Sequence, residues 1–277
     1  MTMNRKILLA ILFFSFSLSL SAQVGMKIFL EEYDGKLTII KSQGKVKELI
    51  IPASINGKPI AAIGEGAFTR KGLTLVSIPD TVTEIKEGAF SYNELTTLVI
   101  GNSVETIGQK AFYNNRLKDL TIGTKVKTIG MGAFANNDLV RVSIPDSVGS
   151  IEPYAFFYNR ITQITIPNDV ITIGEGAFST NRIYSIVIGD SVEEIGDGAF
   201  FNNALTNITI PNSMNALGKR VFESRLTKRG TVPPVDYLDE NGEILYTTAN
   251  NFDTYFTSTG KKPGKYTYSK NGWEFAK

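Results

Sequence analysis

Hydrophobic and polar positions in the middle of the chain repeat with a period of 22 residues. In each unit a short stretch alternates, so that Leu98 and Ile100 are expected to point inward and Thr97 and Val99 outward. This alternation predicts a β-strand with one face on a core. Proline or glycine follows each strand and predicts a turn, and the second half of the unit returns over the core.

The most regular column of the repeat is a phenylalanine. Alanine precedes it in every copy but the last, where valine does, and its members are Phe68, Phe90, Phe112, Phe134, Phe156, Phe178, Phe200 and Phe222. A fixed period of this length is typical of a solenoid, in which each unit packs only on its neighbours. We expect these rings to fill the core between successive coils.

A second regular column is polar. It consists of Asn93, Asn115, Asn137, Asn159, Asn181 and Asn203. We expect these side chains to form a ladder inside the turns, where the amide satisfies backbone groups of its own coil and of a neighbour. A row of ligand-binding amides is the alternative.

Units such as residues 139–148 (LVRVSIPDSV) and 173–178 (IGEGAF) resemble leucine-rich repeats of the BspA-like type. The resemblance covers residues 45–226 strongly. It implies a mainly β or α/β-type solenoid with a parallel concave sheet and with short, irregular or helical turns on the convex side. The segments outside the repeat predict β-rich caps at both ends. Members of this family are exported or surface proteins that bind other proteins, and no conserved catalytic residues come with the resemblance.

Residues 1–22 are predicted to be a secretory signal peptide. Arg5 and Lys6 give a positive start, an apolar stretch follows, and small residues end it at Ala22. An uncleaved membrane anchor is the alternative, but the stretch is shorter than the roughly 20 apolar residues of a membrane span. We therefore predict an exported protein (secreted, periplasmic or on the cell surface) with no transmembrane span in the mature chain.

The repeat sets the expected domain boundaries. Residues 23–60 depart from the template and are predicted to be an N-terminal cap with a hairpin turn at Asn56-Gly57. Residues 61–226 form the predicted solenoid. Residues 227–277 contain two hairpin signals, the second at Asn271-Gly272, and are similar to C-terminal segments of treponeme-like members of the family. A C-terminal cap is the simpler role for this segment, and a sorting or anchoring signal is the alternative.

Composition excludes several kinds of chemistry. The 277 residues include no cysteine and no histidine, which removes disulfides, thiolate sites and the commonest general base. Without residues 1–22 the chain has 27 basic and 27 acidic residues, and a neutral chain has no general attraction for nucleic acid. Gly-x-Gly sequences such as 174–176 lack the rest of a phosphate-binding motif and recur with the repeat, so we interpret them as turn glycines. The acid pair Glu193-Glu194 lacks calcium-loop spacing. We predict no catalytic residue, no metal site and no cofactor.

Two rows of residues are candidates for partner binding. The first is an outward column of the predicted strands: Thr97, Asp119, Arg141, Gln163, Ser185 and Asn207. Its members vary between units as a recognition surface would, although a solvated strand face looks similar. The second row follows the repeated phenylalanine and includes Tyr92, Tyr113 and Tyr158. Aromatic residues are enriched in interfaces, but they serve equally well in packing between coils.

Together these features predict a non-enzymatic exported repeat scaffold for protein–protein interaction or adhesion. Binding would use an extended surface of the solenoid. The expected partner is a protein, either from the host extracellular matrix or from the bacterial envelope, and not a nucleic acid. A structural or self-assembling envelope protein is the alternative.

Overall fold

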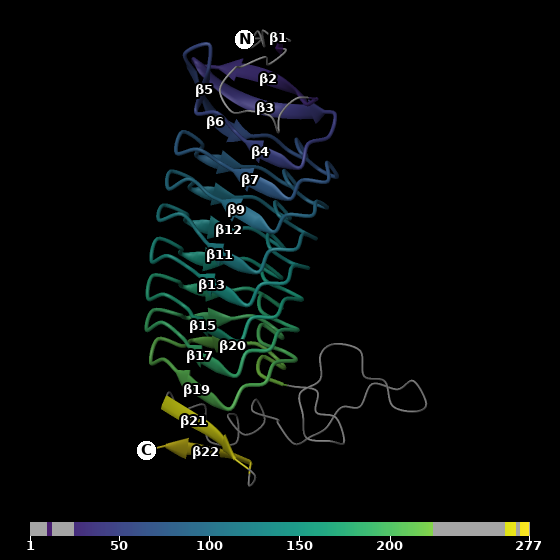
Figure 1. The fold of residues 1–277 in the computed structure, drawn as a ribbon. Helices are drawn as coiled ribbons and strands as arrows, with labels where there is room; N and C mark the ends of the chain where they lie inside the picture. Colours follow the sequence, from purple (N-terminus) through teal and green to yellow (C-terminus); the bar gives the residue numbers. More distant parts are fainter. Residues whose placement is uncertain (1–9, 13–24, 224–263, 270–271, 277) are drawn as a thin grey trace, which may run out of the picture.

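The computed structural model describes residues 10–12, 25–223, 264–269 and 272–276. These residues form a stack of β-coils with a hairpin at each end (Figure 1). Every regular element in the described part of the chain is a β-strand. The protein is therefore a mainly β solenoid, in agreement with the periodic pattern of its sequence.

One side of each coil carries a short strand, and we call this row of strands the front ladder. It consists of β4 (Glu48–Ile50), β7 (Leu75–Ser77), β9 (Thr97–Val99), β11 (Asp119–Thr121), β13 (Arg141–Ser143), β15 (Gln163–Thr165), β17 (Ser185–Val187) and β19 (Asn207–Ile210). Paired strands run parallel, and from β7 onward the paired residues are 22 positions apart. Hydrogen bonding divides the ladder into three sheets, with breaks between β9 and β11 and between β13 and β15.

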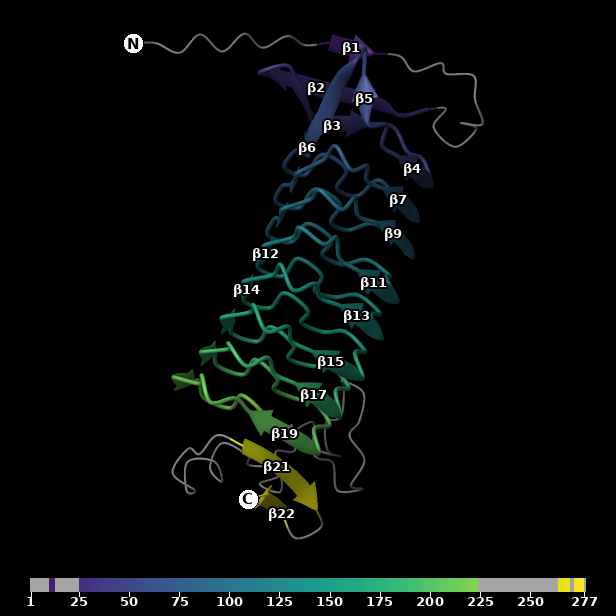
Figure 2. The same ribbon diagram turned by 90° about the vertical axis from the view of Figure 1, so that its left-hand side faces the viewer.

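A second parallel ladder runs along the opposite side of the coils (Figure 2). Its two-residue strands are β8 (Glu84–Ile85), β10 (Thr106–Ile107), β12 (Thr128–Ile129), β14 (Ser150–Ile151), β16 (Thr172–Ile173), β18 (Glu194–Ile195) and β20 (Ala216–Leu217). We call it the rear ladder. The family resemblance implied irregular or short helical turns on that side. A ladder forms instead because an inward aliphatic residue, such as the fully buried Ile107, recurs in register in each coil.

An antiparallel hairpin closes the N-terminal end of the stack. It consists of β2 (Lys27–Tyr33) and β3 (Lys36–Gln43), and β3 pairs in parallel with β6 (Lys58–Ile63), which heads the rear ladder. β5 (Ser54–Ile55) pairs with β6 across Asn56-Gly57, whose φ values are 51° and 76°. These positive values suit a two-residue hairpin loop, and the predicted turn is confirmed.

Two further strands lie within the segments predicted at the N-terminal end of the chain. β1 (Ala10–Leu12) pairs antiparallel with β2. It lies inside residues 1–22, for which the signal peptide stays a prediction. Because β4 already belongs to the front ladder, stacking begins inside the segment that we expected to be the N-terminal cap.

A second hairpin lies at the C-terminal end of the stack. β21 (Gly264–Ser269) and β22 (Gly272–Ala276) are antiparallel, and β21 pairs with β19 at the edge of the front ladder. Tyr266 of β21 is fully buried. This pairing confirms the expected hairpin, but Gly272 pairs with Ser269 and therefore belongs to β22 rather than to the turn. The other hairpin signal, at Asn241-Gly242, and the loss of phase after Phe222 lie outside the described residues.

The repeated phenylalanines form one continuous stack through the core. All eight rings, from Phe68 to Phe222, are at most 1% exposed. Neighbouring ring centroids are 5.1–5.6 Å apart and the ring planes differ by 1–12°. This is the offset stacking that aromatic rings prefer. The small residue before each phenylalanine is also buried, as close packing of successive turns requires.

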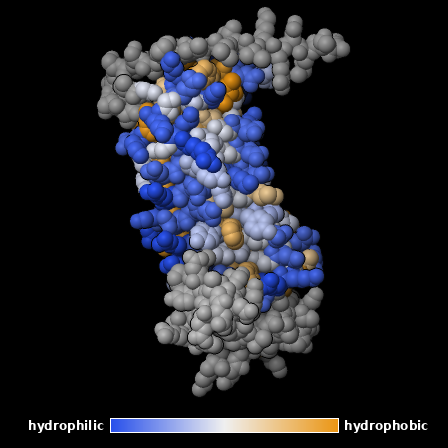
Figure 3. All heavy atoms as spheres, turned by 90° about the vertical axis from the view of Figure 1, so that its right-hand side faces the viewer, coloured by the Kyte–Doolittle hydropathy of each residue, from blue (hydrophilic) through white to orange (hydrophobic). Residues whose placement is uncertain are grey.

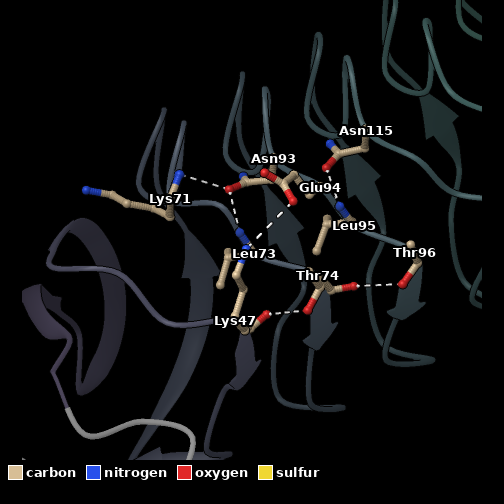
Figure 4. A network of polar contacts seen from close by, with 9 residues as sticks. All are labelled: Lys47, Lys71, Leu73, Thr74, Asn93, Glu94, Leu95, Thr96 and Asn115. Atoms are coloured by element: carbon tan, nitrogen blue, oxygen red, sulfur yellow. Dashed lines mark hydrogen bonds and ion pairs between the residues drawn. The ribbon is translucent and has the colours of Figure 1, made fainter.

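The asparagine column forms hydrogen bonds between coils (Figure 4). Asn93 Oδ1 accepts from the backbone N–H of Lys71 at 2.9 Å and of Leu73 at 3.2 Å. Its Nδ2 donates to the carbonyls of Phe68 at 2.8 Å and Phe90 at 2.9 Å. Equivalent bonds link two coils at Asn115, Asn137, Asn159, Asn181 and Asn203. All six side chains are buried, and their amide groups are hydrogen-bonded to the backbone.

Candidate functional site

The front ladder brings the first row of candidate residues onto one face. Thr97, Asp119, Arg141, Gln163, Ser185 and Asn207 are the first residues of consecutive strands. Five of them are exposed and Ser185 is half-buried. The next residue of each strand points into the core, as Leu120 and Ile164 do, each with 4% exposure. The alternating pattern therefore places this row on the surface.

The row contains one ion pair. Arg141 Nη2 lies 2.8 Å from Asp119 Oδ1, and the two residues are direct partners in the pairing of β11 with β13. Their side chains are 80% and 60% exposed, so the pair contributes little to stability. It does hold the Arg141 side chain beside the neighbouring strand.

A hollow of about 750 Å³ lies on the front ladder over β13, β15 and β17. It spans the break between the sheet of β13 and the sheet of β15. Its outward-facing wall residues include Arg141, Ser143, Gln163, Thr165, Ser185 and Val187. Three members of the first candidate row therefore share one depression.

Tyr184 is a neighbour of this hollow that the sequence reasoning missed. It is 45% exposed, and its hydroxyl accepts a hydrogen bond from Gln163 Nε2. The residues at the same repeat position are Thr74, Thr96, Lys118, Val140, Thr162 and Thr206. The sequence could have indicated Tyr184, because it is the one aromatic residue among these equivalent positions.

The second candidate row lies in the turns that hold the repeated phenylalanines, which we call the turn edge. Tyr92 is 42% exposed and lies edge-to-face with Tyr113, with ring centroids 5.3 Å apart. The Arg70 guanidinium is 4.4 Å from the centroid of the Tyr92 ring, a cation–π distance. Tyr158 contacts Phe157 instead, at 6.0 Å. The structure thus brings together Tyr92 and Tyr113 and leaves Tyr158 in a separate cluster.

The side that carries the turn edge is mainly hydrophilic, with isolated hydrophobic residues (Figure 3). Tyr92 and Tyr158 have a left-handed backbone, each with a φ of 56°. Asparagine holds the same repeat position at 114, 136 and 202 and tolerates this conformation, whereas a bulky residue is an outlier there. The N–H of Tyr92 donates to the Tyr113 carbonyl at 2.8 Å. Stacking of the coils therefore fixes the backbone from which these rings project.

The charged groups of the described residues are dispersed over the surface. No group of three or more acidic residues there could hold a metal ion. On the rear side, the hydrogen bond from Lys127 lowers the pKa of the Glu105 carboxyl, and the two groups are 2.7 Å apart. A search of the described residues for a helix able to cross a membrane found none.

Comparison with known proteins identifies the repeat. Residues 41–161 and 149–241 match the BspA type leucine-rich repeat region, in six copies. No curated protein matches the chain.

Two solved structures share the fold. A leucine-rich cell surface protein from Faecalibacterium prausnitzii A2-165 is 24% identical, with a TM-score of 0.50 over 91% of this chain and 59% of that one. The leucine-rich repeat protein of T. pallidum is 19% identical, with a TM-score of 0.50 over 71% of this chain and 85% of that one. This chain therefore spans less than two thirds of the F. prausnitzii protein. Because the repeat match extends over well more than half of the residues, the protein belongs to the BspA-type leucine-rich repeat family.

Proposed function

We propose that this protein is an exported, non-enzymatic scaffold that binds another protein through the front ladder. Leucine-rich repeat solenoids generally bind proteins along an extended surface. The observation that carries the proposal is the hollow over β13, β15 and β17, which collects variable polar side chains at the middle of the exposed strand face.

The front ladder is large enough for this role. Eight strands at a spacing of about 4.8 Å extend for about 35 Å. A standard protein interface covers about 800 Å² on each partner. A partner seated over the central strands would therefore reach both the hollow and the Asp119–Arg141 ion pair.

The chemistry of the hollow favours a polar protein surface as the partner. Gln163 and Thr165 offer donors and acceptors, and Val187, 55% exposed, adds an apolar contact. Arg141 at the rim carries a charge that Asp119 already balances. This mixture is close to the composition of non-obligate interfaces, which are no more apolar than the remaining surface.

We further propose that the partner lies outside the cytoplasm, in the host extracellular matrix or in the bacterial envelope. The residue pattern of a signal peptide at 1–22 supports export. The cell-surface description of the F. prausnitzii relative is consistent with this location.

A capture experiment tests the proposal. Chain 23–277 is immobilised and exposed to extracts of extracellular matrix and of bacterial envelope, and bound proteins are identified by mass spectrometry. Thr165→Arg places a long charged side chain in the hollow, and Thr106→Arg is its control, because Thr106 is also an exposed strand threonine but lies on the rear ladder. We expect a protein captured by the wild type and by Thr106→Arg but lost with Thr165→Arg. Equal capture by both variants would refute binding at the front ladder.

Self-assembly through stacked ends is supported less well. The hairpin of β2 and β3 and the hairpin of β21 and β22 occupy the two ends of the stack. Light scattering over a concentration series distinguishes the two functions, since growth of the particle mass with concentration would favour the structural alternative.

A further inference from the structure

Tyr154 occupies a repeat position that most coils give to glycine. The equivalent residues are Gly66, Gly88, Lys110, Gly132, Gly176, Gly198 and Arg220. The φ of Tyr154 is 59°, a left-handed conformation that L side chains disfavour. Its N–H donates to the Glu175 carbonyl at 2.8 Å, so the ladder of coils holds the residue in this conformation. The equivalent residues of the other coils have the same left-handed backbone, so what distinguishes Tyr154 is its large side chain.

The side chain of Tyr154 is held as firmly as its backbone. The ring lies edge-to-face with Phe157, with centroids 6.0 Å apart and an interplanar angle of 89°. It also covers Gly176, where an added Cβ would lie 2.5 Å from Tyr154 Cε1. The hydroxyl donates to a carboxylate oxygen of Glu175. That hydrogen bond, then burial and the carboxylate charge, raise the pKa of Tyr154.

The Tyr154 ring forms one wall of a cavity of about 350 Å³ on the turn edge. This volume lies at the lower end of the range of about 300–1,000 Å³ that is common for small-ligand sites. Phe201 also lines the cavity, and the Arg220 guanidinium lies over its ring, 4.6 Å from the centroid. Glu175, Asp197 and Lys219 line the cavity from the same repeat position of three successive coils.

The lining of this cavity carries equal numbers of acidic and basic side chains: Glu175 and Asp197 with Lys219 and Arg220. Arg220 Nε is also paired with Glu223 Oε2, 2.5 Å away and outside the lining. Both carboxylates already accept hydrogen bonds, Glu175 from Tyr154 and Asp197 Oδ1 from the backbone N–H of Lys219 at 2.8 Å. A lining with equal numbers of acidic and basic side chains, several of which already have partners, favours a neutral ligand over an ion.

We propose that this cavity binds a neutral sugar residue of a glycan. A pyranose has an apolar C–H face that can lie against an aromatic ring and a rim of hydroxyls that need both donors and acceptors. The cavity provides the aromatic wall of Tyr154, carboxylate acceptors and cationic donors. It lies on the turn edge and shares no residue with the hollow on the front ladder, so it is independent of the protein-binding function.

Saturation-transfer NMR on chain 23–277 tests this site. The probes are the methyl glycosides of glucose, galactose, mannose and N-acetylglucosamine at millimolar concentration, with glucuronic acid as a charged comparison. Tyr154→Gly removes the aromatic wall and introduces the residue that suits the left-handed backbone, so this variant retains the fold. Tyr92→Asn is the control, because it removes an exposed turn-edge tyrosine outside the cavity and introduces the asparagine of the other coils.

We expect at least one neutral glycoside to bind the wild type and Tyr92→Asn equally. Its affinity should fall about tenfold or more in Tyr154→Gly, the loss that corresponds to one good ring contact. Absence of binding by every neutral glycoside would overturn the proposal. Unchanged binding by Tyr154→Gly, or tighter binding of glucuronic acid than of the neutral sugars, would overturn it as well.

Discussion

Replacing Asn137 by alanine removes a buried link between two coils of the solenoid. The side chain is 7% exposed. Its Oδ1 accepts from the Leu117 N–H at 3.1 Å, and its Nδ2 donates to the carbonyls of Phe112 and Phe134, each at 3.1 Å. All three contacts disappear in Asn137→Ala, and the methyl group cannot replace them.

The expected loss of stability follows from these contacts. A hydrogen bond contributes about 0.5–1.5 kcal/mol net, and a buried partner left without one costs about 1–3 kcal/mol. The Phe112 and Phe134 carbonyls still accept from Asn115 and Asn159, so the Leu117 N–H is the group that loses its partner. One unsatisfied donor and two lost hydrogen bonds predict a decrease of about 2–6 kcal/mol in the free energy of unfolding. Since each coil of a solenoid depends on its neighbours, we expect the damage to loosen the coils on both sides of Asn137.

Urea denaturation followed by far-UV circular dichroism measures this loss as a shift of the midpoint. Asn136→Gly is the matched control, because Asn136 is the adjacent asparagine, is only half-buried and has a φ of 55° that glycine accepts. The control should stay within about 1 kcal/mol of the wild type. Equal midpoints for the two variants would refute the view that the amide ladder holds the coils together.

Three other predictions concern the core, the close approach of successive coils and the ionisation of Tyr154. Phe134→Ala should lower the free energy of unfolding by about 3–5 kcal/mol, and Thr121→Ala, at an exposed position, by less than about 0.5 kcal/mol. Equal urea midpoints for the two variants would contradict the assignment of core and surface. Gly130→Ala should lower the free energy of unfolding by about 1–3 kcal/mol, because the added Cβ would lie 2.7 Å from the backbone of the preceding coil. Gly149→Ala is the control and should be neutral in the same assay, since the nearest atom to its added Cβ would be 4.0 Å away. Tyr154 should ionise above the ordinary tyrosine value of about 10, because its folded-state pKa is raised. The stability from its hydrogen bond is therefore present below that pH and lost as the pH rises through the folded-state value. The measurement is an ultraviolet titration of the wild type and of Tyr154→Phe, and the difference between the two curves reports the ionisation of Tyr154. An ordinary tyrosine pKa in that difference would contradict the prediction.

The sequence by itself determined the coil, its period and its core. Stacking of similar units places equivalent residues in register, so a buried position such as Phe134 appears as a fixed column along the chain. The alternation around Leu120 likewise indicated which residues face outward on the front ladder. The hairpin at Asn56-Gly57 was readable because its turn chemistry is local.

Only the tertiary structure decided where surface residues meet. The hollow spans the break in hydrogen bonding between β13 and β15, and no local propensity encodes such a break. The rear ladder has strands of two residues, too short to give a periodic signal of their own. The cavity at Tyr154 depends on a left-handed backbone and on Glu175 in the next coil, 21 residues along the chain. Contacts between coils join residues that are distant in sequence, and their geometry is set only when the coils stack.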